Sequence, residues 1–177
     1  MPRQHLIWPV IFALCICSLS ACKAKREEPA PPGEETAALA ETPEGFALID
    51  ASAFNVSDYK GRVLVLDFWA TWCGPCKKEI PHLIELQDKY RDQGLTIIGI
   101  TYDDNPDGDV PSYAAEVGMN YVNVRANDEL KRKYAVIGLP TIIIYDRDGN
   151  EIMKRPGYIG KDQLEAKIKP LLEPPRT

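Results

Sequence analysis

Two cysteines stand three positions apart in Cys73-Gly74-Pro75-Cys76, and they are the residues of this chain best suited to chemistry. Cysteine thiolates attack disulfides and bind soft metal ions. A crosslink across so short a loop stabilises a fold little, because loop-closure stabilisation grows with loop length. We therefore expect the pair to be reactive or metal-binding rather than a structural crosslink.

The N-terminal segment has the pattern of a secretory signal. A basic start precedes an apolar run over residues 6–19 and the small-residue exit Leu19-Ser20-Ala21-Cys22. The run is shorter than the ~20 apolar residues that a membrane-spanning helix needs. The exit resembles the lipobox of bacterial lipoproteins, which implies cleavage before Cys22 and a lipid on that cysteine. The alternative is an ordinary secretory signal with a chance cysteine.

The remaining potential ligands argue against a metal site. Cys15 and Cys17 would leave with the signal, and Cys22 would be consumed by the lipid. Beyond the signal the only histidine is His82, so no second Cys/His pair exists to complete a tetrahedral zinc site. We expect neither a metal nor another cofactor.

Composition divides the chain into three parts. We expect a lipoprotein signal over residues 1–21, a lipidated Cys22 with a flexible linker over 22–44, and one domain over 45–177. The linker is rich in Pro, Glu and Ala and has too few large apolar residues to form a core. The formal net charge of −5 gives no basic footprint for nucleic acid.

The order of apolar runs within the domain predicts an α/β fold. We expect strands at 46–49, 54–56, 62–70, 95–102, 121–124, 141–145 and 151–155, and helices at 76–91, 111–117, 128–134 and 161–172. Residues 62–70 are almost continuously apolar, as in a central strand buried on both faces. Alternating strands and helices that end in a hairpin indicate a mixed sheet flanked by helices, with an N-terminal strand pair.

Residues 67–81, Asp-Phe-Trp-Ala-Thr-Trp-Cys-Gly-Pro-Cys-Lys-Lys-Glu-Ile-Pro, closely resemble the active-site segment of thioredoxin. The resemblance covers about residues 46–172 and implies a thioredoxin fold. Cys-Lys-Lys-Glu-x-Pro after the dithiol, and a helix and strand near 110–124 that resemble a central insertion, point to the extracytoplasmic TlpA/ResA-like branch of the redoxin (AhpC-TSA) superfamily. That branch includes thiol reductants for cytochrome c maturation, so it implies a similar activity outside the cytoplasm.

The dithiol residues receive distinct roles. Cys73 falls at a helix start, where free N–H groups and the helix dipole favour a thiolate, so we expect it to attack. Cys76, one turn inside, would resolve the mixed disulfide. Pro75 suits the first helical turn. With Gly74 and a shielding Trp72, it would contact the substrate.

Pro140 opens a predicted strand, which is one common place for a proline. The resemblance implies instead a cis-proline loop that faces the dithiol. Leu139 and Pro140 would then bind the substrate, with the Leu139 backbone pairing with the substrate chain.

Two acidic residues are candidates for proton transfer. Asp67 interrupts the apolar central strand, where burial of a carboxylate is costly, so we expect it to accept the proton of Cys76; a polar residue at the strand end is the alternative. Glu79 either tunes the dithiol or lies on a solvated helix face. Gly99 stands where cytoplasmic thioredoxin has a buried lysine, which weakens any carry-over of an Asp–Lys proton pathway.

The function we predict is reduction of protein disulfides by a lipid-anchored monomer that a membrane thiol donor recharges, because the compartment is oxidising. A disulfide oxidase or isomerase is an alternative. A thiol peroxidase would need Pro-x-x-x-Thr-x-x-Cys, but Leu66 and Ala70 occupy those positions. A copper carrier would need a wider cysteine spacing and a distal histidine.

Overall fold

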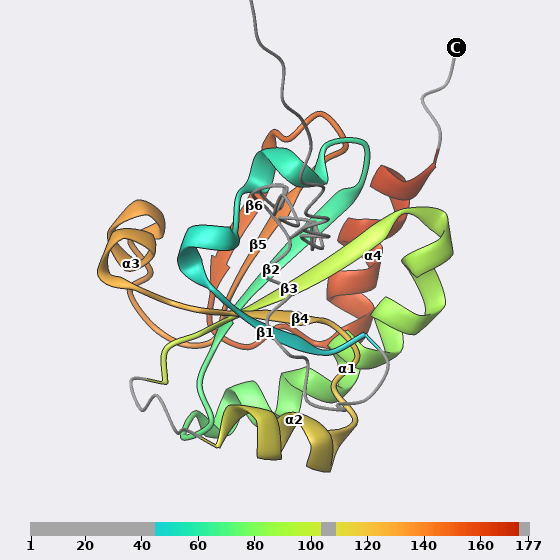
Figure 1. Cartoon of the computed structure of the whole chain (residues 1–177). Coiled ribbons are helices and arrows are strands. Elements are labelled where there is room, and N and C mark those ends of the chain that lie inside the picture. The colour runs from blue at the N-terminus through green and yellow to red at the C-terminus, as the bar shows by residue number, and fades with distance from the viewer. Residues whose placement is uncertain (1–44, 104–108, 174–177) are drawn as a thin grey trace, which may run out of the picture. The chain divides into compact units, whose positions relative to one another are not determined.

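A six-stranded sheet forms the centre of the computed structural model, which describes residues 45–103 and 109–173 (Figure 1). Its strands are β1 (Ala47–Asp50), β2 (Val63–Trp69), β3 (Leu95–Thr101), β4 (Val122–Arg125), β5 (Thr141–Tyr145) and β6 (Glu151–Pro156). Their spatial order is β1-β4-β3-β2-β5-β6. The first three neighbouring pairs in this order are parallel and the last two are antiparallel, which confirms the predicted mixed sheet.

Helices cover both faces of this sheet (Figure 1). They are α1 (Gly74–Tyr90), α2 (Val110–Val117), α3 (Asp128–Tyr134) and α4 (Lys161–Leu172). One core packs α1, α2 and α4 against the sheet, and a second core packs α3 on the opposite face. Within the described ranges, no helix has both the length and the apolar character needed to cross a membrane.

The central strand β2 determines which side chains face the dithiol. All seven of its residues are buried, as its apolar run predicts. Successive side chains of a strand point to opposite faces. Val65 and Trp69 join the core under α1, whereas Leu66 and Phe68 join the core under α3. The alternation therefore places Asp67 on the α1 face.

One predicted strand is not formed. Residues 54–56 lie outside the sheet, and Val56–Tyr59 is a 3-10 helix. The Asn55 side chain accepts a hydrogen bond from the Ser57 backbone N–H at 3.1 Å, which caps that helix and competes with strand pairing. The N-terminal strand pair is thus wrong: β1 pairs with β4 instead.

The predicted central insertion forms α2 and β4, and β4 lies between β1 and β3. The signal, the linker and the acylated Cys22 that we predict lie outside the described residues.

Candidate functional site: a dithiol between an apolar groove and buried acids

The dithiol occupies the first turn of α1. Cys73 is the N-cap residue, and its sulfur accepts a hydrogen bond from the Cys76 backbone N–H at 3.3 Å. The structure holds the pair as a disulfide with a Cα–Cα distance of 5.3 Å. Free N–H groups at a helix start stabilise negative charge, so the reduced Cys73 is placed to carry a thiolate.

The two sulfurs have different surroundings. Cys73 is 5 % exposed and lines an open groove, whereas Cys76 is 1 % exposed and belongs to the core under α1. A protein disulfide from solution therefore reaches Cys73 and not Cys76. This asymmetry agrees with the attacking and resolving roles expected from their order in the sequence.

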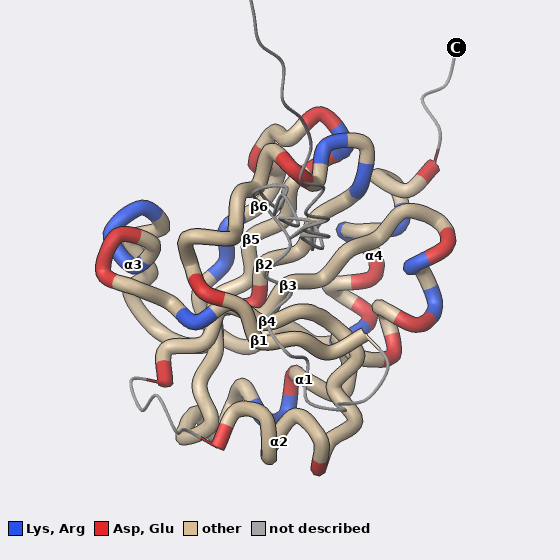
Figure 2. The backbone as a smooth tube through the Cα atoms, viewed as in Figure 1, with Lys and Arg blue, Asp and Glu red and all other residues tan. Residues whose placement is uncertain are grey.

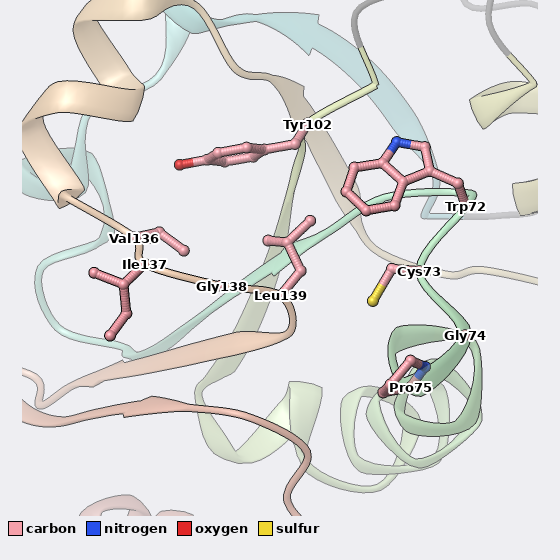
Figure 3. A pocket seen from close by; sticks show the side chains of 9 residues that line it. All are labelled: Trp72, Cys73, Gly74, Pro75, Tyr102, Val136, Ile137, Gly138 and Leu139. Atoms are coloured by element: carbon pink, nitrogen blue, oxygen red, sulfur yellow. The ribbon is translucent and has the colours of Figure 1, made fainter.

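The loop before β5 faces the dithiol. The Leu139–Pro140 peptide bond is cis, as the resemblance to thioredoxin implied. Thr141 Oγ donates to the Gly138 carbonyl at 2.7 Å, and the Gly157 N–H donates to the Pro140 carbonyl at 2.8 Å. These bonds hold the loop on both sides, so Leu139 has a fixed place beside Cys73 (Figure 3).

A groove of about 550 Å³ lies between this loop and the dithiol. We call it the outer groove, and it is lined by residues 72–75, Tyr102 and residues 136–139 (Figure 3). Trp72, expected to shield the site, is 70 % exposed at its edge. Tyr102, Val136 and Ile137 were not among the residues predicted for the site; the only signal was the apolar run ahead of Pro140.

Asp67 lies on the α1 face of the sheet, the face whose core includes Cys76. It is buried, and neither carboxyl oxygen has a hydrogen-bond partner in the described part of the chain. Burial raises the pKa of Asp67 well above its ordinary value, and the negative charge of Glu79 raises it further. A carboxyl in this setting holds a proton more tightly than an exposed aspartate does, and its carboxylate is a stronger base.

Glu79 follows Cys76 by three residues and so shares its face of α1. Its side chain is 0 % exposed, so the alternative of a solvated helix face is wrong. Glu79 Oε1 accepts a hydrogen bond from the Ile159 backbone N–H at 2.9 Å. Burial raises the pKa of Glu79 to about 7, although the Ile159 hydrogen bond and the positive charge of Arg155 lower it.

Tyr121 completes a buried group with Asp67 and Glu79 that we call the acidic interior. Burial raises the pKa of the Tyr121 hydroxyl well above its ordinary value, and the charges of Asp67, Tyr113 and Glu79 raise it further. All three side chains are buried, and the charges of Asp67 and Glu79 act on the Tyr121 hydroxyl. No sequence pattern predicted a role for Tyr121, because this residue directly precedes β4 and reaches the group only through the order of the strands in the sheet.

No side chain can enter the acidic interior from Gly99. A Cβ at Gly99 would lie 2.0 Å from Asn123 Oδ1 and 2.9 Å from Trp69 Nε1. Trp69 Nε1 donates to Asn123 Oδ1 at 2.8 Å, which keeps the amide in that space. The packing around Gly99 therefore leaves no room for the lysine that cytoplasmic thioredoxin has at this position.

Two lysines and a histidine of α1 lie outside the outer groove. Lys77 and Lys78 are exposed, and Lys77 Nζ lies 4.9 Å from the centre of the Tyr113 ring. His82 is half-buried against Tyr158 at 6.3 Å between ring centres. Neither lysine nor this histidine lines the outer groove.

A mixed sheet of this order, a disulfide at the start of α1 and a cis-proline loop beside it define a thioredoxin-fold protein with a redox-active cysteine pair. The model of the Redoxin family matches residues 28–168. The chain belongs to this family, and it is a thiol–disulfide oxidoreductase similar to ResA.

Individual relatives agree. The chain is 31 % identical to the thiol-disulfide oxidoreductase ResA of Bacillus thuringiensis over 175 residues, 96 % of this chain and 98 % of the relative. It is 32 % identical to the thiol:disulfide interchange protein HelX of Rhodobacter capsulatus over 63 % of this chain and 62 % of that one. A thiol:disulfide interchange protein of the thioredoxin family from Chlorobium tepidum has a solved structure with a TM-score of 0.62 and 29 % identity, covering 68 % of this chain and 86 % of that one.

Proposed function

We propose that this protein reduces disulfides of protein substrates outside the cytoplasm, with Cys73 as the nucleophile and Cys76 as the resolving thiol. The observation that carries the proposal is the division around the dithiol: Cys73 opens on a groove that can receive a polypeptide, and Cys76 is buried in the core under α1, on the face of the sheet that carries Asp67.

The reaction transfers two electrons in two exchanges. The Cys73 thiolate attacks one sulfur of the substrate disulfide, which forms a mixed disulfide and releases the other substrate sulfur as a thiolate. The Cys76 thiolate then attacks the Cys73 sulfur. The Cys73–Cys76 disulfide forms, the second substrate thiolate leaves, and the substrate has been reduced.

The second exchange needs a proton acceptor for Cys76. We assign this role to Asp67, because it is buried on the face of the sheet that packs under α1 and because its raised pKa makes its carboxylate a stronger base than that of an exposed aspartate. Glu79, with a pKa of about 7, is half ionised at neutral pH and sets the charge that Asp67 experiences. Both side chains act from the interior, so neither needs to contact the substrate.

The proposed location rests on the sequence. A signal over residues 1–21 and acylation of Cys22 would anchor the domain to a membrane through the linker over 22–44. A membrane thiol donor would then return the disulfide to the dithiol in an oxidising compartment. Cytochrome c maturation is the process proposed for such a reductant, by likeness to the TlpA/ResA-like branch.

The test is a reduction potential together with a turnover assay on the full chain in detergent. A reductant has a potential near −270 mV, as in thioredoxin, whereas a strong oxidant lies near −120 mV. We expect a value at the reducing end and catalysed reduction of insulin disulfides by a dithiol. A potential near −120 mV with no insulin reduction would contradict the proposed direction.

A further inference from the structure

Beyond the cis-proline loop, the outer groove has an apolar end that takes no part in the disulfide exchange. We call this end the apolar wall. Ile137 and Val136 form its far end, and Tyr102 lies on the side of the groove that carries Trp72 (Figure 3). Ile137 is 90 % exposed, which leaves a large apolar side chain in water. None of the lining residues is charged. Clustered exposed apolar side chains of this kind mark a surface that binds something apolar.

A cation stands at the edge of this wall. Lys131 Nζ lies 5.2 Å from the centre of the Tyr102 ring, a cation–π arrangement. Lys131 belongs to a basic last turn of α3 that also contains Arg132 and Lys133. Figure 2 shows these basic residues gathered on α3. Lys131 therefore places a positive charge beside Tyr102, whereas the acidic residues of this helix, Asp128 and Glu129, lie in its first turn.

The loop geometry fixes which part of a substrate meets this wall. Leu139 lies beside Cys73, and the loop leads from Leu139 back to Ile137, away from the dithiol (Figure 3). A substrate chain that extends along this loop with its cysteine at Cys73 therefore continues toward Ile137. In an extended chain, side chains two positions apart point the same way and lie about 7 Å apart. A residue two positions from the reacting cysteine therefore faces the apolar wall.

We infer that Ile137 and Tyr102 form a specificity site for an apolar side chain two residues from the substrate cysteine, and that Lys131 favours an acidic residue next to it. The substrate class is thus an extended cysteine-containing segment with an apolar residue at that distance and a negative charge. This inference deepens the proposed function, since it rests on attack by Cys73 through the outer groove.

The test measures attack by Cys73 alone. Three peptides carry a nitrothiobenzoate group on their cysteine: one with Ile two residues away and an adjacent Glu, one with Ser in place of that Ile, and one with Lys in place of that Glu. In the full chain with Cys76→Ser, the Cys73 thiolate attacks the peptide sulfur, and nitrothiobenzoate leaves as a coloured thiolate. The readout is the second-order rate of colour release.

We expect the Ile peptide to react about tenfold faster than the Ser peptide, since a side chain gains on this order in an apolar site. Ile137→Ser should reduce that ratio below threefold, and Ile152→Ser, an exposed isoleucine on β6, should leave it unchanged. The Glu peptide should react about threefold faster than the Lys peptide at low salt. Lys131→Gln should remove that preference, and the exposed Lys169→Gln should not.

Equal rates for the Ile and Ser peptides, or an unchanged ratio in Ile137→Ser, would overturn the apolar site. An unchanged charge preference in Lys131→Gln would overturn the role of that lysine. The leaving group makes the attack independent of the reduction potential. A peptide preference in a protein with an oxidising potential would therefore contradict the proposed reduction and leave the specificity site standing.

Discussion

The outer groove and the acidic interior, on the two sides of the dithiol, differ in which kind of side chain is exposed and which is buried. On the outer groove, large apolar side chains such as Ile137 and Trp72 stand in water with no polar role. In the acidic interior, Asp67, Glu79 and Tyr121 are buried with hydrogen-bonding atoms that have no partner in the described part of the chain. Each arrangement is costly by itself, because apolar groups favour the interior and polar groups favour water.

This inversion shows how one short helix start serves two tasks. Apolar groups at the surface gain free energy only when a substrate covers them, which suits binding. Carboxyls in the interior have raised pKa values, which makes their carboxylates stronger bases and suits proton uptake. The 17-residue helix α1 separates these environments because Cys73 caps it and Cys76 lies one turn inside.

The largest expected effect belongs to the interior and concerns the pH dependence of stability. The pKa of Glu79 rises from 4.5 to about 7 on folding, so the folded state holds the proton more tightly than the unfolded state. The contribution of Glu79 protonation to the free energy of unfolding is fully present below pH 4.5 and is lost as the pH rises through about 7. With ~1.4 kcal/mol per pKa unit, the loss is on the order of 3 kcal/mol.

Glu79→Gln should flatten that part of the curve, measured by urea unfolding of the oxidised full chain between pH 4 and 8. Glu116→Gln, an exposed glutamate, should keep the slope of the parent. A Glu79→Gln protein with the same slope as the parent would place the source of the pH dependence elsewhere.

The next effect is on resolution. Asp67→Asn removes the proton acceptor of Cys76, and general-base catalysis contributes 10²-fold or more, so release of the mixed disulfide should slow about 100-fold at pH 7. The rate is measured by stopped flow after the full chain is loaded with substrate on Cys73. Asp148→Asn, in an exposed turn, serves as the control. Resolution at the parent rate in a folded Asp67→Asn protein would remove the assigned role.

A smaller effect tests how closed the interior is. Gly99→Ala forces Asn123 away from Trp69, and overpacking a buried site costs 1–3 kcal/mol, so we expect about 2 kcal/mol of lost stability. Gly160→Ala adds a methyl group into open space and should change stability far less. Urea unfolding measures both. Equal stability of the two variants would show that the interior yields to an added side chain.

The smallest effect belongs to the outer groove. Trp72→Ala removes an exposed ring, so the stability of the fold should change by less than about 0.5 kcal/mol. The value of kcat/KM for insulin should fall about threefold to tenfold, because part of the apolar contact with the substrate is lost. If the loss in free energy of unfolding exceeded the loss of kcat/KM expressed as a free energy, Trp72 would stabilise the fold more than it binds the substrate. That result would contradict the contrast between the two sides.

The sequence predicted the parts of the site that depend on local order. The spacing of Cys73 and Cys76, the helix that follows them and the apolar run of β2 are local features, and the structure has them as expected. The cis bond before Pro140 came from the resemblance to thioredoxin. The strand expected at 54–56 is not formed. The Asn55 side chain accepts a hydrogen bond from the Ser57 backbone N–H, which favours a 3-10 helix over strand pairing.

Residues that meet only through the sheet order could not be predicted. The charge of Asp67, on β2, acts on Tyr121, which directly precedes β4, because β4 lies beside β3 and β3 beside β2. Lys131 lies at the edge of the outer groove because its side chain packs over the ring of Tyr102, which comes from a distant part of the sequence. No local pattern contains such contacts. The signal, the linker and the lipid on Cys22 stay predictions.

The most direct test of the central claim is the identity of the cysteine that carries the mixed disulfide. The full chain with Cys76→Ser is incubated with native insulin, whose disulfides are intact, and the covalent product is mapped by mass spectrometry. The Cys73→Ser variant is treated in parallel. The division between an outer groove and an acidic interior predicts a product through Cys73 in the first variant and none in the second. A product through Cys76 in the Cys73→Ser variant, at a comparable rate, would contradict it.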